Sequence, residues 1–132
     1  MSKFKSQGFN KTFRNARKGL MLVIKSEINI RFHLIIAFFV LLLAGFLRFS
    51  YVEFCLLLFA IAIVIISEML NTAIEFTLDS IYHNKYSRMV GMAKDISAGA
   101  VMLASFVSAF VGIIIFGRHL FFLIFILLIN KL

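Results

Sequence analysis

Four polar side chains recur at helical spacing in an otherwise apolar part of this sequence. Glu68, Asn71, Glu75 and Asp79 are three, four and four residues apart, so a helix would place them on one narrow stripe. Carboxylate and amide oxygens in this arrangement can hold a metal ion and accept a proton. The simpler interpretation is that these side chains lie beyond a bilayer, in water. It suits Asp79 but not Glu68, which directly follows the uncharged run 54–67 and would be costly in lipid without a function.

The spacing along the stripe suggests that roles are divided by depth. A helix rises about 1.5 Å per residue, so Glu68 would lie roughly 10 Å deeper than Glu75. The deeper carboxylate suits a base for the hydroxyl group of a membrane lipid. The shallower one suits a Mg²⁺ ligand that meets substrate phosphates. Glu27 is expected at a depth similar to that of Glu75, on another helix, and could supply the second metal ligand.

A second polar cluster, Gly91, Lys94 and Asp95, stands where another long apolar run begins. Lys94 is a point charge suited to the β- and γ-phosphates of ATP, and Gly91 allows close approach of the backbone. The sequence contains no GxxxxGK[ST] phosphate loop and no protein kinase signature set. We expect no metal role for the three isolated histidines, His33, His83 and His119.

Helices must position these residues, because 62% of the chain is hydrophobic and its long apolar runs lack charge. A bilayer core takes about 20 helical residues. The runs therefore predict an all-α membrane protein with spanning helices at about residues 29–48, 52–80 and 93–117. Residues 9–27 place apolar and basic side chains on different helical faces, which predicts an amphipathic helix on the membrane surface; the alternative is a solvated basic helix that only anchors the protein. The apolar tail 118–132 either extends the last helix or lies in the interface.

The distribution of Lys and Arg predicts the orientation. Eight basic residues lie between Lys3 and Arg31 and three between Lys85 and Lys94, whereas the opposite loop has only Arg48. The positive-inside rule then places the N-terminus and the shallow end of the stripe in the cytoplasm. The net charge of +8 accompanies membrane segments, so anionic lipid and ATP phosphates are better partners than nucleic acid, and we expect no nucleic-acid partner.

On these residues the sequence resembles the prokaryotic diacylglycerol kinase and undecaprenol kinase family, over roughly residues 8–117. The segment SEMLNTAIEFTLD, residues 67–79, is similar to the family signature E-x-L-N-[ST]-A-I-E-x-x-x-D. The AKD at residues 93–95 and the KGL at residues 18–20 match as well. The segment 27–33 resembles that of Gram-positive-type undecaprenol kinases, whereas enterobacterial-type diacylglycerol kinases have an acidic residue in place of His33.

The resemblance implies a homotrimeric lipid kinase of the bacterial inner membrane, with a kinase domain over residues 1–117, composite sites between subunits, and Mg²⁺ with ATP as the phosphate donor. It makes Glu68 the catalytic base and Glu27 and Glu75 the metal ligands. The ATP-binding residues that it implies are Lys11 or Arg14, Glu27, Glu75, Asp79, Lys94 and Asp95. The residues that would orient the site or bind substrate are Asn71, Arg31 and Gly91.

The segment around His33 favours undecaprenol as the lipid acceptor, with diacylglycerol as the alternative. Two readings of another class are a small ion or proton transporter, in which the stripe is a relay, and a non-catalytic assembly subunit. ATP turnover that depends on added lipid alcohol separates the kinase from both. A row of small residues also predicts close helix contact, between subunits or within one: Ala100, Ala104, Ser108 and Gly112.

Overall fold

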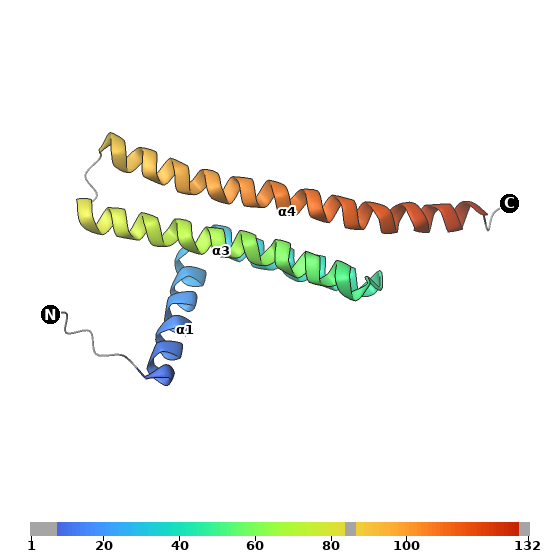
Figure 1. Cartoon of the computed structure of the whole chain (residues 1–132), viewed down its shortest axis with the longest axis horizontal. Helices are drawn as coiled ribbons and strands as arrows, with labels where there is room; N and C mark the ends of the chain where they lie inside the picture. The colour runs from blue at the N-terminus through green and yellow to red at the C-terminus, as the bar shows by residue number, and fades with distance from the viewer. Residues whose placement is uncertain (1–7, 84–86, 130–132) are drawn as a thin grey trace.

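The computed structural model describes residues 8–83 and 87–129. In this part the chain forms four helices: α1 (Phe9–Ser26), α2 (Ile28–Phe46), α3 (Tyr51–Tyr82) and α4 (Arg88–Ile129). The last three run side by side, and α1 leaves them at a steep angle (Figure 1). The contact between α3 and α4 is the most extensive, α2 packs on α3, and α1 packs on α2. The predicted all-α fold is confirmed, while Lys3, residues 84–86 with Lys85, and residues 130–132 of the tail lie outside the described residues.

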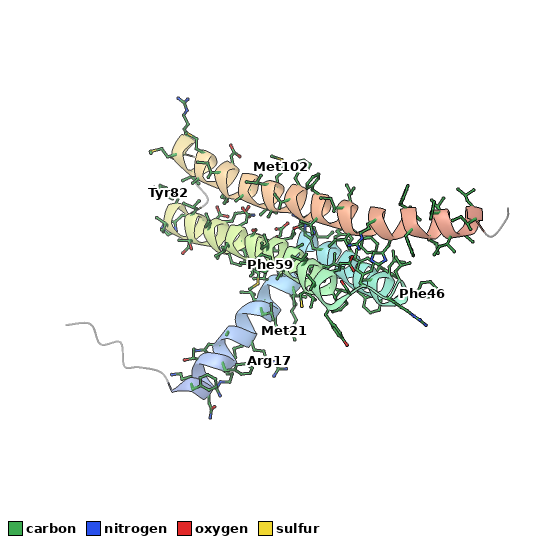
Figure 2. The ribbon with its side chains drawn as sticks, turned by 45° about the vertical axis from the view of Figure 1, so that its right-hand side comes forward. Arg17, Met21, Phe46, Phe59, Tyr82 and Met102 are labelled. Carbon is green, nitrogen blue, oxygen red and sulfur yellow. The ribbon has the colours of Figure 1, made fainter. Side chains whose placement is uncertain are left out.

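The surface helix α1 fits the amphipathic helix that the sequence predicts. Its apolar Phe9, Phe13 and Leu20 are all exposed, and none of its residues is buried. Figure 2 shows α1, with Arg17 and Met21, projecting away from the other helices. A helix with exposed apolar and basic faces is stable on a membrane surface, where lipid covers the apolar face. The helix α1 ends at Ser26, because Glu27 has an extended backbone (φ −102°, ψ 119°) that interrupts the helical conformation between α1 and α2.

Among the described residues, α2, α3 and α4 are each long and apolar enough to cross a membrane. Phe46 and Tyr82, where α2 and α3 end, mark opposite ends of this bundle (Figure 2). At 32 residues, α3 is about 48 Å long, which exceeds a bilayer core of about 30 Å. We call the end where residues 71–82 of α3 meet residues 88–97 of α4 the junction end. The far end is where residues 46–53 lie near residues 116–119.

The last helix, α4, is longer at both ends than the predicted range 93–117. It begins at Arg88 and continues to Ile129, so the described part of the apolar tail extends this helix. The prediction stopped at Gly117 because Arg118 and His119 follow it. A helix is continued by its backbone hydrogen bonds, and polar side chains do not end it when they find partners. In Figure 1 the C-terminal part of α4 extends past the end of α3.

The core between the three helices is narrow and rich in small residues. Ala37 and Ala44 are buried on α2, Ala60 on α3 and Ala104 on α4, and small side chains let membrane helices approach closely. The Ser108 hydroxyl donates to the Ala60 carbonyl oxygen across 2.8 Å. Ala104 and Ser108, both in the predicted small-residue row, thus serve the packing of α4 on α3 within one chain.

Candidate active site

The stripe on α3 forms as its spacing predicts, and its members have unequal exposure. Glu68 is buried, with 5% of its surface exposed, and Thr72 beside it is 2% exposed. Asn71, Glu75 and Asp79 are half-buried. Burial of a carboxylate among apolar helices costs several kcal/mol unless it is paired or hydrogen-bonded. The structure therefore makes Glu68 the most constrained acidic group of the stripe.

A chain of hydrogen bonds joins the stripe to α4. The Ser97 hydroxyl donates to Asn71 Oδ1 across 2.6 Å, and Asn71 Nδ2 donates to Glu75 Oε1 across 2.9 Å. Ser97 also donates to the Lys94 carbonyl oxygen at 2.9 Å, so the start of α4 fixes its position. The amide of Asn71 can satisfy both partners only in this orientation. Asn71 thus holds one oxygen of Glu75, and its orienting role in a reaction stays a prediction.

Sequence reasoning missed Ser97. The residue lies three positions after Lys94, on the same face of α4, and this helical spacing was the available signal. It is buried, with 8% of its surface exposed. A buried hydroxyl in a membrane helix normally finds a partner on a neighbouring helix, and that expectation could have linked Ser97 to the amide of Asn71.

The predicted nucleotide-binding residues Lys94 and Asp79 contact each other. Lys94 Nζ lies 2.6 Å from Asp79 Oδ1, with about a third of each side chain exposed to solvent. Such a partly solvated pair adds little stability, on the order of 1 kcal/mol or less, but it fixes where the ammonium group lies. Lys94 is therefore held about one helical turn from the level of Glu75. Asn71, Glu75, Asp79, Lys94 and Ser97 together form what we call the junction-end network.

Glu68 has a partner that the sequence did not indicate. His33 Nε2, on α2, lies 3.4 Å from Glu68 Oε1. The exposed fraction is 30% for the His33 side chain and 6% for that of Glu68. The isolation of His33 in the sequence gave no sign of this contact, because the two residues lie on different helices and far apart along the chain.

An apolar cavity of about 390 Å³ opens beside this pair, between α2, α3 and α4. His33 lines it at the end nearest Glu68, and Ser105 and Ser108 are its other polar lining residues. Its α4 lining runs from Ser105 to Phe116, which is about 16 Å along the helix axis. A hydrocarbon chain fits such a lining, and a polar head at its His33 end would meet the imidazole and lie about one helical turn from Glu68.

The structure does not bring all predicted site residues together. Glu27 lies at the break between α1 and α2, half-buried. Lys11 and Arg14 are exposed on α1, whose blue N-terminal half lies away from α3 and α4 (Figure 1). Within the described part of the chain, no hydrogen bond or ion pair joins these three residues to the junction-end network. A single chain thus presents Glu75 and Lys94 without the predicted N-terminal cations.

The remaining predicted residues have simpler positions. Asp95 and Arg31 are exposed. The Gly91 N–H donates to the Ser87 carbonyl oxygen at 2.9 Å, so it serves the first turn of α4. Among the described residues, no group of three or more His, Cys, Asp or Glu side chains forms a metal cage. Mg²⁺ bound with ATP needs only one or two carboxylates plus phosphate oxygens, and the hard oxygen donors of Glu75 and Glu27 fit that requirement.

The far end carries a second polar network that the sequence did not suggest. Glu53 accepts hydrogen bonds from the Ser50 backbone N–H at 2.9 Å and from the Ser50 hydroxyl at 2.7 Å. On α4, His119 Nε2 lies 3.2 Å from Glu53 Oε2, and Arg118 Nη1 lies 3.5 Å from Oε1. The Phe49 ring stacks on His119 with a centroid distance of 4.4 Å. We call these five residues the far-end network.

Comparison with known proteins identifies related sequences. A family model described as prokaryotic diacylglycerol kinase matches residues 14–116. An undecaprenol kinase of Bacillus subtilis is 34% identical over 108 residues, which cover 82% of this chain and 87% of the relative. A diacylglycerol kinase of Synechocystis sp. is 32% identical over 101 residues, which cover 76% of this chain and 58% of that relative. Nearly all residues of both polar networks lie within the family match, and Arg118 and His119 lie just beyond it.

Proposed function

Because this chain belongs to the prokaryotic diacylglycerol kinase family, and is therefore a lipid kinase, we propose that it transfers the terminal phosphoryl group of ATP to the hydroxyl group of undecaprenol. The proposal rests on the buried Glu68, which lies about one helical turn beyond Ile65 at the His33 end of an apolar cavity. A lipid alcohol lying in the cavity brings its hydroxyl to a carboxylate. The enzyme class makes the transporter and assembly-subunit readings unnecessary.

The acceptor proposed is undecaprenol, and diacylglycerol is the alternative. The undecaprenol kinase relative shares the greater identity and is covered over most of its length. The cavity also favours a lipid with one hydrocarbon chain over a lipid with two, because its lining is confined to a single groove between three helices. His33 at the head of the groove supports the same choice, since the sequence around it resembles that of undecaprenol kinases.

In the proposed reaction, Glu68 accepts the proton of the lipid hydroxyl as its oxygen attacks the γ-phosphorus of ATP. The bond from that phosphorus to the β–γ bridging oxygen breaks, and ADP leaves. Such transfers need an in-line approach and positive charge on the transferring group. Lys94 supplies that charge, and Asp79 fixes the position of its ammonium group at 2.6 Å.

The junction-end network is the proposed nucleotide site. Asn71 holds Oε1 of the half-buried Glu75 by a hydrogen bond, and Oε2 has no side-chain hydrogen bond among the described residues. Glu75 and Glu27 would hold Mg²⁺, and the ion would supply positive charge that neutralises the phosphates. Glu68 lies about 10 Å from Glu75 along α3, which separates the lipid hydroxyl from the metal level. This matches a nucleotide that enters from water and a lipid that enters from the bilayer.

The proposed orientation has the junction end at the cytoplasmic face of a bacterial inner membrane. The basic residues of α1, and Arg88 and Lys94 at the start of α4, would then all lie at the cytoplasmic face. Glu53 and Glu68 are 15 positions apart on α3, about 22 Å along the axis. With the far-end network at the outer boundary of a core of about 30 Å, Glu68 lies inside the inner leaflet and Glu75 at the cytoplasmic interface.

We also propose that the working enzyme is a homotrimer that completes each site across a subunit boundary. Among the described residues, Lys11, Arg14 and Glu27 have no hydrogen bond or ion pair with the junction-end network, so we propose that a neighbouring chain supplies them. Mixing Glu68→Gln chains with Glu27→Gln chains in detergent, at a Mg²⁺ concentration at which neither is active alone, should then restore part of the activity in proportion to mixed trimers. No recovery in cross-linked mixed oligomers would place both carboxylates in a site made by one chain.

The experiment that tests the acceptor uses the purified chain in lipid vesicles with [γ-³²P]ATP and Mg²⁺. Undecaprenol and diacylglycerol are added separately at equal mole fraction, and labelled lipid is separated by thin-layer chromatography. We expect label in undecaprenyl phosphate, with kcat/KM at least tenfold above that for diacylglycerol. Preferred labelling of phosphatidic acid would transfer the assignment to diacylglycerol.

A further inference from the structure

The contact between His33 and Glu68 joins the apolar cavity to the proposed base. His33 belongs to both, because it lines the cavity and lies 3.4 Å from Glu68 Oε1. Its side chain is 30% exposed, whereas that of Glu68 is 6% exposed. Anything polar that reaches Glu68 through the cavity therefore passes the imidazole ring.

A polar residue at this position needs an explanation. His33 is flanked by apolar residues of α2, and a polar side chain inside a membrane bundle is costly and usually carries a function. An aliphatic residue would pack between α2 and α3 without that cost. In the described part of the chain, His33 is the one side chain within ion-pair distance of the Glu68 carboxylate, and no hydrogen bond to that carboxylate is formed. The imidazole is thus the polar group placed to orient the carboxylate in this apolar setting.

The geometry divides the two oxygens of the carboxylate. His33 faces Oε1, so Oε2 is the oxygen left to accept a proton from the lipid hydroxyl. A carboxylate with a single partner turns about its side-chain bonds unless that partner holds it. A general base is effective only when its accepting oxygen lies within hydrogen-bond reach of the proton.

We propose that His33 is a positioning residue for phosphoryl transfer: its Nε2, 3.4 Å from Glu68 Oε1 in this structure, closes to a hydrogen bond in the reacting complex and keeps Oε2 turned toward the His33 end of the cavity. This inference rests on the proposed function, in which Glu68 accepts the hydroxyl proton and the cavity holds the lipid chain. His33 itself gains and loses no proton in the step. The proton moves from the lipid hydroxyl to Glu68, and the phosphoryl group moves from ATP to the lipid oxygen.

A matched histidine serves as the control. His119 Nε2 also lies close to a carboxylate, 3.2 Å from Glu53, but Ser50 already donates two hydrogen bonds to that carboxylate. His119 is far from the His33 end of the cavity and belongs to neither proposed substrate site. Equal substitutions at the two histidines thus compare a carboxylate held by one partner with a carboxylate held by several.

The test measures kcat, KM for each substrate and thermal stability in His33→Leu, His33→Gln, His119→Leu and His119→Gln. His33→Leu removes the donor, and we expect kcat to fall about 10- to 100-fold, a part of the 10²–10⁴ that general base catalysis contributes. KM for MgATP should stay within about twofold, because the nucleotide site is untouched. His33→Gln can donate through its amide N–H and should keep kcat within about fivefold of the wild-type value. Both His119 variants should keep wild-type kcat.

Wild-type kcat in His33→Leu would overturn the proposal, and so would equal losses in the Leu and Gln variants. If His33→Leu does not fold, His33→Met keeps an apolar chain of similar length and gives the same comparison. The assay uses whichever lipid alcohol the wild-type chain phosphorylates. A wrong acceptor assignment therefore appears in the wild-type rates, and a wrong role for His33 appears in the variants.

Discussion

Helix α3 carries two shielded glutamates, Glu53 in its first turn and Glu68 near its middle, and each lies beside a histidine from another helix. The two pairs differ in how fully the carboxylate is satisfied. At the far end, Glu53 has partners in Ser50, His119 and Arg118. Near the junction end, Glu68 has His33 alone among the described residues, and a cavity opens beside it. A carboxylate whose oxygens are all engaged stabilises a helix end, whereas one with an oxygen to spare can react.

The comparison also explains why burial alone does not identify the site. The side-chain exposed fraction is 14% for Glu53 and 6% for Glu68, so both carboxylates are mostly shielded. Glu53 and Ser50 form a capping box at the start of α3, in which each side chain accepts from the other residue's backbone N–H. That arrangement accounts for Glu53 without any reaction. Nothing comparable accounts for Glu68 in the middle of a helix.

The largest expected difference comes from making the same Glu→Gln substitution at Glu68 and at Glu53. Glu68→Gln removes the proposed proton acceptor and should lower kcat for the lipid alcohol by about 10²- to 10⁴-fold. Glu53→Gln should leave kcat within about twofold, because the far-end network takes no part in transfer. Both values come from the labelled-phosphate assay in vesicles, and similar losses in the two variants would remove the functional distinction between the ends.

A smaller effect is expected when the proposed Mg²⁺ ligands are substituted. Glu75→Gln and Glu27→Gln should each raise the Mg²⁺ concentration needed for half-maximal activity, because a neutral amide binds a hard cation more weakly than a carboxylate does. Excess Mg²⁺ should therefore restore part of the activity. The measurement is a Mg²⁺ titration at fixed ATP with Glu53→Gln as the control. A wild-type Mg²⁺ response in both variants would show that the metal assignment is wrong.

The smallest effect is expected when the cap at the far end is removed. Ser50→Ala loses the hydroxyl that pairs with Glu53, and loss of an N-cap costs about 0.5–2 kcal/mol. The variant should unfold at a temperature a few degrees lower in detergent micelles, with unchanged kcat. Thermal unfolding followed by circular dichroism gives the first quantity. A kinetic defect at full stability would mean that the far end communicates with the site.

The sequence predicted the parts of the molecule that depend on local order. The stripe from Glu68 to Asp79 follows from helical spacing within one helix, and Asn71 does contact Glu75 one turn away. The all-helical fold followed from apolar runs. These features need no knowledge of how helices pack on one another.

Features that depend on pairing between helices could not be read in the same way. The contacts of His33 with Glu68 and of Ser97 with Asn71 join different helices, and no spacing along the chain records them. The sequence left open whether the tail after Gly117 extends the last helix, because the uncharged run ends at Arg118. In the structure α4 continues to Ile129, and Arg118 and His119 lie beside Glu53 of α3.

We propose that α3 places a deep proton acceptor, Glu68, apart from a shallower nucleotide site. Nucleotide binding by the Glu68→Gln chain tests this separation. Isothermal titration with MgATP in detergent gives the dissociation constant, and the same preparation is assayed for transfer to undecaprenol. We expect a dissociation constant for MgATP within about threefold of the wild-type value, together with loss of turnover. A dissociation constant that rises as much as turnover falls would place Glu68 in the nucleotide site and contradict the division.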